Sequence, residues 1–312
     1  MGAHFACQEC GAALAIATGQ MTASCPYCAS PNVVERPPAP DLPTPEFVLG
    51  FSLGQEPARE LLGRWLASQS IFTASGVRTA KVDSMRGIYL PAYLYSGVAR
   101  TRYSASIGEN YTEREGYWTT DSQGKRVRRT RTVTKTEWRS LQGERAEYVA
   151  ERVVTASRGV PNAELEAIEP FDLRALGRYN AGMIAGWLAE EPSLSLAQCY
   201  ELARQEALAQ VGQNLTRFMP GDTHRNLHYE SKFERESAVL VMLPIWALAL
   251  RYDPEKPPFR LLINAQTGRA YGKAPKSWVK IALAVGLALA AIVAAVLFFL
   301  LFASLAQHGG LG

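Results

Sequence analysis

The sequence predicts an α+β fold with an N-terminal zinc ribbon, an antiparallel β-rich domain that contains a helical insertion, and a single C-terminal transmembrane helix. Three observations lead to this prediction. Four of the five cysteines lie in two CxxC pairs near the N-terminus, segments rich in Tyr, Thr and Val fill much of the middle, and the last charged side chain is Lys280.

The cysteine pairs supply the candidate metal ligands Cys7, Cys10, Cys25 and Cys28. Each CxxC turn presents two thiolates to one ion, and two turns complete the tetrahedral sulfur site that Zn²⁺ favours, although such a site also accepts iron. Four thiolates leave no open position for a substrate, so we predict a structural metal. We expect two short strands between the pairs, with a turn at Thr18-Gly19-Gln20. The ribbon is interpreted either as a docking module or as a folded cap without a partner.

Changes in composition set the expected domain boundaries. They are 1–36 for the zinc ribbon, 37–50 for a proline-rich linker, 51–275 for a cytoplasmic α+β domain (β part 86–158, helical part 161–218, β part 222–272), 278–304 for a transmembrane helix and 305–312 for a short external tail. A proline-rich segment is stiff and extended, so the linker should separate the ribbon from the rest of the chain.

Periodic apolar residues predict two helices in the α+β domain. Residues 56–70 carry Leu62 and Leu66 on one face, and residues 195–218 repeat an apolar side chain every three or four positions after the candidate N-caps Ser193 and Ser195. Cys199 falls on the apolar face of the second helix, which favours a buried core thiol over a nucleophile.

Strands are predicted on both sides of the helical part. Residues 87–157 are rich in β-branched and aromatic side chains, with turn signals at 96–97, 107–110 and 122–124. An unbroken apolar run at 239–250 predicts a central strand buried on both faces, and 259–271 predicts a hairpin. The similar segments 89–93 and 242–246, each with a central proline, indicate either a duplicated β unit with a helical insertion or two independent bends.

The C-terminal segment predicts a membrane anchor. Residues 281–303 carry no polar side chain, and at about 1.5 Å per residue a helix of this length spans a hydrocarbon core of roughly 30 Å. Arg269, Lys273, Lys276 and Lys280 precede it and only His308 follows, which predicts an inner-membrane protein with its N-terminal domain in the cytoplasm and its C-terminus outside. Small residues such as Gly286 permit close approach of another helix, so an oligomer or larger membrane assembly is a further interpretation.

A basic segment in the β-rich part is the second candidate site. It contains Lys125, Arg126, Arg128, Arg129, Arg131, Lys135 and Arg139. One interpretation is a solvated edge strand whose charges block aggregation. Another is contact with anionic lipid or an acidic protein partner. A third is nucleic-acid binding, which the nearby aromatic residues suit but which the modest net charge of +4 disfavours.

No motif in the sequence predicts an enzyme. The P-loop, GxSxG, HExxH and dinucleotide-binding glycine patterns are all absent from the sequence. His224 and His228 are four residues apart, but the flanking residues do not favour a helix, so a second metal site is not expected there.

The assembled motifs resemble a poorly characterised group of bacterial zinc-ribbon proteins with a C-terminal membrane anchor, often labelled primosomal or helicase-like. The resemblance covers CQECG and CPYC, GIYLPAYLY, TASRGVP at 155–161, and MLPIWALALRY followed by INAQTGRAYG. It implies that the four clustered cysteines are metal ligands. Some relatives are encoded beside phage-shock-type and SPFH-domain (flotillin-like) proteins, which implies recruitment of such partners to the membrane. Ala29 stands where the family knuckle often has Gly.

These observations together predict a membrane-anchored adaptor or scaffold with a structural zinc ion. The ribbon or the basic segment would dock a protein partner at the cytoplasmic face of the membrane. The alternative is a membrane-tethered nucleic-acid-binding protein.

Overall fold

Two long antiparallel strands form the centre of the fold, β5 (Lys81–Thr120) and β9 (Thr223–Arg251). The computed structural model describes residues 3–16, 24–37 and 42–308. The sheet runs in the order β11-β10-β9-β5-β8-β2-β1-β3, with β6 beside β5 further along the edge that pairs with β8, and β4 beside β9. The other described strands are β1 (Ala3–Cys7), β2 (Ala13–Ile16), β3 (Val33–Arg36), β4 (Phe47–Val48), β6 (Arg126–Thr155), β7 (Gly177–Arg178), β8 (Leu188–Glu190), β10 (Phe259–Asn264) and β11 (Ala270–Gly272).

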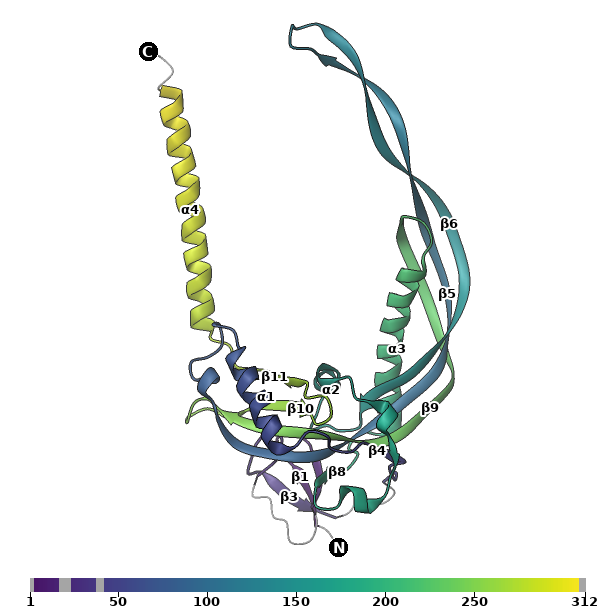
Figure 1. Cartoon of the computed structure of the whole chain (residues 1–312), viewed down its shortest axis with the longest axis vertical. Helices are drawn as coiled ribbons and strands as arrows, with labels where there is room; N and C mark the ends of the chain where they lie inside the picture. Colours follow the sequence, from purple (N-terminus) through teal and green to yellow (C-terminus); the bar gives the residue numbers. More distant parts are fainter. Residues whose placement is uncertain (1–2, 17–23, 38–41, 309–312) are drawn as a thin grey trace.

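Four α-helices lie within the described residues, so the predicted α+β class is confirmed (Figure 1). They are α1 (Gln55–Ala67), α2 (Asn162–Ile168), α3 (Leu196–Phe218) and α4 (Trp278–His308). α1 buries Leu62 and Leu66 against Trp246 and its neighbours on β9 and β10. α3 begins at the capping box of Ser195 and buries Cys199 against β5 and β6. α4 is long and apolar enough to cross a membrane.

The part at 161–218 that was predicted to be helical contains less α-helix than expected. Only α2 and α3 are α-helical there, and the chain between them forms 3-10 turns and the strands β7 and β8. Gly177, Gly182 and Gly186 interrupt this stretch, and glycine weakens a helix by roughly 1 kcal/mol relative to alanine. β8 then pairs with both β5 and β2 and joins the central sheet to the ribbon.

The proline-rich segment does not hold the ribbon apart from the body. Leu14 and Ala15 of β2 pair with Glu190 and Ala189 of β8, so the ribbon continues the central sheet. Side chains from both cysteine pairs belong to the same hydrophobic core as the middle of β5 and β9. The proline content of a segment indicates that the segment is stiff. It does not indicate that β2 and β8, which lie on either side of the segment in sequence, pair with each other. The predicted turn at 18–20 lies outside the described residues.

The two proline-containing segments pair with each other around a local two-fold axis. Leu90 lies opposite Leu243, and Tyr89 and Pro91 lie opposite Pro244 and Met242. Equivalent bonds flank the axis, since the Pro91 oxygen accepts from the Ala156 amide and the Pro244 oxygen accepts from the Ala265 amide.

The two-fold relation extends to neighbouring elements. The Ala156 oxygen accepts from the Ser193 and Leu194 amides, and the Ala265 oxygen accepts from the Ser52 and Leu53 amides. β8 lies parallel to β5 at Tyr89, and β4 lies parallel to β9 at Met242. The units β4-α1-β5-β6 and β8-α3-β9-β10 are therefore two copies of one arrangement, as the duplication interpretation predicted.

β5 and β6 continue beyond the body as a two-stranded arm, defined here as the chain from Gly108 to Trp138 (Figure 1). The predicted turn at 122–124 closes it, and Gly124 there has a φ of 81°. The turns predicted at 96–97 and 107–110 were wrong because both stretches lie inside the continuous strand β5. At 96–97 the chain forms a bulge instead, and Gly108 lies where a Cβ would meet Trp138 and two threonines.

A line of bulges crosses the sheet at Ser96 and Gly97 of β5, before the base of the arm at Gly108, and we call it the crease. β5 shifts register at Ser96 and Gly97 against both neighbours, and Glu151 of β6 and Arg235 of β9 have φ values of 56° and 52°. Bulges bend strands and increase their twist. The arm and α4 extend from the same side of the body, and the ribbon lies at the opposite end (Figure 1).

Candidate metal centre and basic arm

The two CxxC pairs form matching turns. The Gly11 amide donates to the Cys7 oxygen at 3.0 Å, and the Ala29 amide donates to the Cys25 oxygen at 2.8 Å. The residue after each pair has a left-handed backbone, with φ of 75° at Gly11 and 57° at Ala29. These turns bring the thiols of each pair to one side, so the sequence spacing alone accounts for the local geometry.

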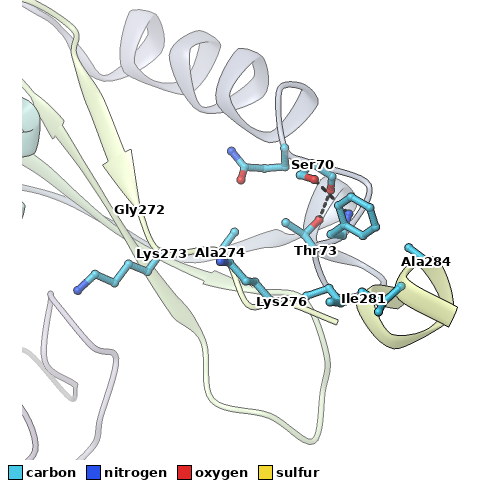
Figure 2. Close-up of a pocket in the computed structure, with 11 residues that line it drawn as sticks. Ser70, Thr73, Gly272, Lys273, Ala274, Lys276, Ile281 and Ala284 are labelled. Carbon is cyan, nitrogen blue, oxygen red and sulfur yellow. Dashed lines mark hydrogen bonds between the residues drawn. The ribbon is translucent and has the colours of Figure 1, made fainter. Parts of the chain in front are cut away.

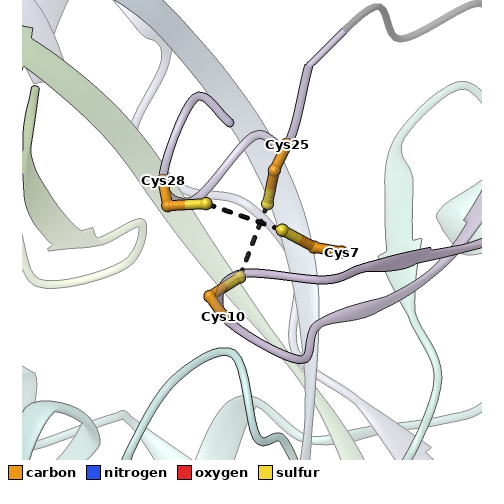
Figure 3. A group of neighbouring side chains, drawn as sticks. All are labelled: Cys7, Cys10, Cys25 and Cys28. Carbon is orange, nitrogen blue, oxygen red and sulfur yellow. Dashed lines mark hydrogen bonds between the residues drawn. The ribbon is translucent and has the colours of Figure 1, made fainter. Parts of the chain in front are cut away.

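The four sulfur atoms converge on one point (Figure 3). All lie within 4.8 Å of one another, and the Sγ atoms of Cys7 and Cys28, and of Cys10 and Cys25, are 3.6 Å apart. As thiols, Cys10 and Cys28 resist ionisation. A hydrogen bond with Cys25 raises the pKa of Cys10 well above its usual range, and burial raises the pKa of Cys28 to about 11. A bound cation would displace these protons, so the donor set fits a thiolate-binding metal.

The second turn is fixed to the body by a buried hydrogen-bond network. Tyr27 lies between Cys25 and Cys28, and its hydroxyl donates to Glu190 of β8 at 2.7 Å. The Ser157 hydroxyl donates to the other carboxylate oxygen of Glu190 at 2.5 Å. Burial raises the pKa of Glu190 to about 7. Tyr27 and Glu190 are both buried, so this hydrogen bond joins the second cysteine turn to β8 away from solvent.

The register of the arm separates its charges onto two faces. Residues directly opposite in an antiparallel pair share a face, so every second residue of β5 joins every second residue of β6. The mixed face carries the carboxylates Glu109, Glu113, Glu115 and Glu137 together with Arg129, Arg131, Lys135 and Arg139. Lys135 contacts both Glu113 and Glu115 at 2.8 Å, so the basic charge on this face is largely matched.

The opposite face of the arm carries no carboxylate, and we call it the basic face. Its residues are Gly108, Asn110, Thr112, Arg114, Gly116, Trp118 and Thr120 on β5, and Arg126, Arg128, Thr130, Thr132, Thr134, Thr136 and Trp138 on β6. Trp118 is 62% exposed, and the Arg126 guanidinium lies 5.8 Å from its ring centroid. A Cβ at Gly116 would lie 2.9 Å from the Arg128 side chain, so glycine there leaves room for Arg128 to cross the strand.

Arg225 of β9 extends this face toward the body. Its guanidinium lies 3.9 Å from the centre of the Trp138 ring, and it sits opposite Ser106 on the same side of β5. The exposed threonines between Trp118 and Trp138 offer hydroxyl groups along the arm. The basic face thus combines arginine, tryptophan and threonine, with Asp222 as an acidic neighbour at its base, where it accepts from the Asn110 amide at 2.7 Å. Such a surface attracts anions along its outer part.

The seven predicted basic residues thus do not form one site. Arg126 and Arg128 lie on the basic face, whereas Arg129, Arg131, Lys135 and Arg139 lie on the mixed face. Lys125 lies in the closing turn. Arg114 and Arg225 belong to the basic face but were not predicted as site residues. The alternation of side chains along β6 could have assigned its basic residues to two faces from the sequence alone. Which residues of β5 and β9 share each face depends on the strand register, which the sequence does not show.

The remaining predicted residues do not form a further metal site. His224 lies opposite Ile107 and His228 opposite Ser104, so the bulge at Asn226 places the two histidines on opposite faces. Within the described residues, the four cysteines are the group able to hold a metal. Cys199 is buried, as predicted, and burial raises the pKa of its thiol to about 11.

No family model matches the chain, and no solved structure matches it. Over 243 residues, 76% of this chain, it is 21% identical to the uncharacterized protein YdjG of Bacillus subtilis (strain 168). The match spans 66% of that protein's length.

Proposed function

We propose that this protein is a membrane-anchored adaptor that holds a protein partner at the cytoplasmic face of the inner membrane. α4 would cross the membrane, and the basic residues before it would keep the body in the cytoplasm. The observation that carries the proposal is the placement of the metal centre and α4 at opposite ends of one continuous fold (Figure 1). A ribbon fixed in this way is presented away from the membrane at a constant orientation.

A groove beside the second cysteine turn is the proposed docking surface. It has a volume of about 570 Å³ and is lined by Cys28, Pro31, Asn32 and Lys256, among others. The four thiolates would hold Zn²⁺ as a structural ion, since all four coordination positions are filled by protein. The metal then shapes one wall of the groove and takes no part in catalysis. The resemblance noted above makes SPFH-type and phage-shock-type proteins the first partners to test.

Recovery of partners from native membranes tests this function. Full-length protein would be purified in mild detergent, and bound protein and nucleic acid would both be identified. The variants are Cys28→Ser, which removes a metal ligand, and Lys256→Glu, which reverses a charge in the groove while leaving the thiols intact. We expect both variants to lose the same protein partner. Retention of all partners by both variants would refute docking at the ribbon.

The basic face of the arm favours a second candidate function, binding of nucleic acid by a membrane-tethered protein. Arg114, Arg126 and Arg128 face one side without a carboxylate, beside Trp118, and aromatic and arginine side chains together suit single-stranded nucleic acid. Binding through several phosphates weakens steeply with salt. Nuclease-sensitive recovery that is lost on changing Arg126 and Arg128 to Gln, but kept in Cys28→Ser, would favour this function over the adaptor.

A further inference from the structure

A pocket of about 600 Å³ lies where α4 meets the body (Figure 2). The loop after α1 forms one wall, with Ser70, Phe72 and Thr73. The end of β11 and the segment before α4 form the floor, and Ile281 and Ala284 from the first turns of α4 form the other wall. The two walls come from distant parts of the sequence, so the pocket is a product of the tertiary fold.

The loop and the start of α4 are joined by several contacts. The Ser277 amide donates to the Phe72 oxygen at 2.8 Å, and the Ala74 amide donates to the Pro275 oxygen at 2.8 Å. The Lys280 ammonium donates to the Thr73 oxygen at 2.9 Å. The pocket therefore keeps its shape relative to α4, and any membrane position of α4 fixes the loop as well.

The pocket changes from polar to apolar along the axis of α4. Ser70 and Lys276 lie at the body end, and Ile281, Ala284 and Val285 line the end that continues into the apolar helix. Trp278, which is 76% exposed, marks the boundary, as interfacial tryptophans do. If α4 crosses the membrane, the polar end lies among lipid headgroups and the apolar end among acyl chains.

The surroundings of the pocket are basic. No Asp or Glu occurs between residues 61 and 82 or after residue 255, yet these stretches contain Arg78, Lys81, Arg269, Lys273, Lys276 and Lys280. Lys273 points away from α4 in Figure 2 and lies 3.7 Å from Glu164. Lys276 has no carboxylate partner among the described residues, and it lines the pocket. An anionic group at the polar end would meet this charge.

The same loop presents apolar side chains to solvent. Ile71 is 67% exposed and Phe72 is 39% exposed. They are adjacent to the start of α4 through the contacts described above. Large apolar side chains beside a predicted span are typical of residues that enter the interface of a bilayer.

We propose that this pocket binds one anionic phospholipid, with the phosphate near Lys276 and Ser70 and an acyl chain along Ile281 and Ala284. Ile71 and Phe72 enter the same leaflet and fix the height of the body above it. The site rests on α4 crossing the membrane and is independent of the identity of the docked partner. Its effect is to orient the body with respect to the membrane surface.

Native mass spectrometry of the full-length protein, released from nanodiscs of mixed phosphatidylcholine and phosphatidylglycerol, tests the site without any partner present. We expect one retained phosphatidylglycerol per chain. Ala284→Phe fills the pocket and should abolish retention, whereas the matched control Ala288→Phe lies one turn further along α4 and should not. Lys276→Gln should lower the preference for the anionic lipid about fivefold, the equivalent of about 1 kcal/mol.

Four outcomes would overturn the proposal. Equal lipid retention by the wild type, Ala284→Phe and Ala288→Phe would show only bulk lipid around α4. Equal retention of the neutral and anionic lipids would remove the charge recognition. A dimer mass that disappears in Ala284→Phe would show that a second copy of α4 occupies the pocket. Failure of the wild type to enter nanodiscs would refute both the membrane anchor and this site. That result differs from the loss of a protein partner in the recovery experiment, which would leave the lipid site unaffected.

Discussion

A single residue in the second cysteine turn has a strained backbone. Ala29 adopts φ 57°, the conformation that glycine occupies at the matching position Gly11. A left-handed backbone costs an L-residue roughly 1–2 kcal/mol, and the extra unfolded-state entropy of glycine offsets about half of that. We therefore expect Ala29→Gly to raise the free energy of unfolding of the metal-loaded protein by about 0.5–1 kcal/mol, measured by chemical denaturation. Ala6→Gly in β1, where no such strain exists, should lower it.

Glu190 makes stability depend on pH. Its pKa is raised from the ordinary value of 4.5 to about 7 in the folded protein, chiefly by burial. The folded state thus favours the protonated form, and this contribution is complete below pH 4.5 and is lost as the pH rises to about 7. The expected loss across this window is about 3 kcal/mol.

Denaturation of the wild type and of Glu190→Gln across this window measures the effect. The stability of the wild type relative to the variant should fall as the pH rises. Protonation of the metal-ligating thiols occurs in both proteins and cancels in the difference. A difference that stays constant with pH would show that Glu190 does not titrate in this range.

At the scale of elements, the ribbon and the body form one cooperative unit. Cys7, Leu14, Cys25 and Tyr27 share a core with Ile88 and Leu243. Chelation of the metal should therefore lower the melting temperature of the whole chain, because ribbon unfolding exposes the body core. Calorimetry should show one transition that shifts by more than 10 °C, since structural metal binding contributes several kcal/mol to folding. Two transitions, with the larger one unmoved, would contradict this. Cys199→Ser, which alters no ligand, is the control.

The arm is expected to be separable from the body. Among the described residues of the arm beyond Gly108 and before Trp138, none belongs to the buried core. Replacement of residues 109–137 by a short Asn-Gly turn should change the melting temperature by less than about 3 °C. Leu243→Ala, a core substitution, should cost 2–5 kcal/mol and serves as the comparison. A large fall in the melting temperature on removing the arm would contradict the prediction that the arm is separable from the body.

The extent of successful prediction differs between elements for physical reasons. The CxxC spacing, the cap at Ser195 and the unbroken apolar run in β9 are local patterns, and each predicted the element that formed. The bulge at Ser96 and Gly97 was mistaken for a turn because the same residue types serve both, and only pairing with two neighbours decides between them. The joining of β2 to β8 is likewise non-local.

At the scale of the whole molecule, the arm and α4 extend in the same direction (Figure 1). A planar bilayer crossed by α4 would also meet the arm, whose basic face carries Arg114, Arg126 and Arg128. Charged side chains are costly in hydrocarbon. Because several contacts fix α4 to the body, we predict that the sheet bends at the crease when the protein is in a membrane and brings the arm against the headgroups.

A fluorophore on Ser122→Cys, in the closing turn of the arm, measures its depth. In nanodiscs the label should be quenched by nitroxides on lipid headgroups and not by nitroxides at the bilayer centre. Quenching by bilayer-centre nitroxides would show that the arm enters the hydrocarbon, and no quenching by either would show that it stays in solution. The buried Cys199 should not react with the fluorophore. Wild-type protein, which keeps Ser122, is taken through the same labelling reaction as the control.

The pairing of Leu90 with Leu243 around a local axis has a consequence for how the two halves can vary. Two-fold symmetric contact is the geometry of an isologous homodimer, and here it lies within one chain. In a homodimer every substitution is repeated in both subunits, whereas here a substitution in one half leaves the other half unchanged. The two halves accordingly differ, since β5 and β6 continue into the arm and α3 is longer than α1.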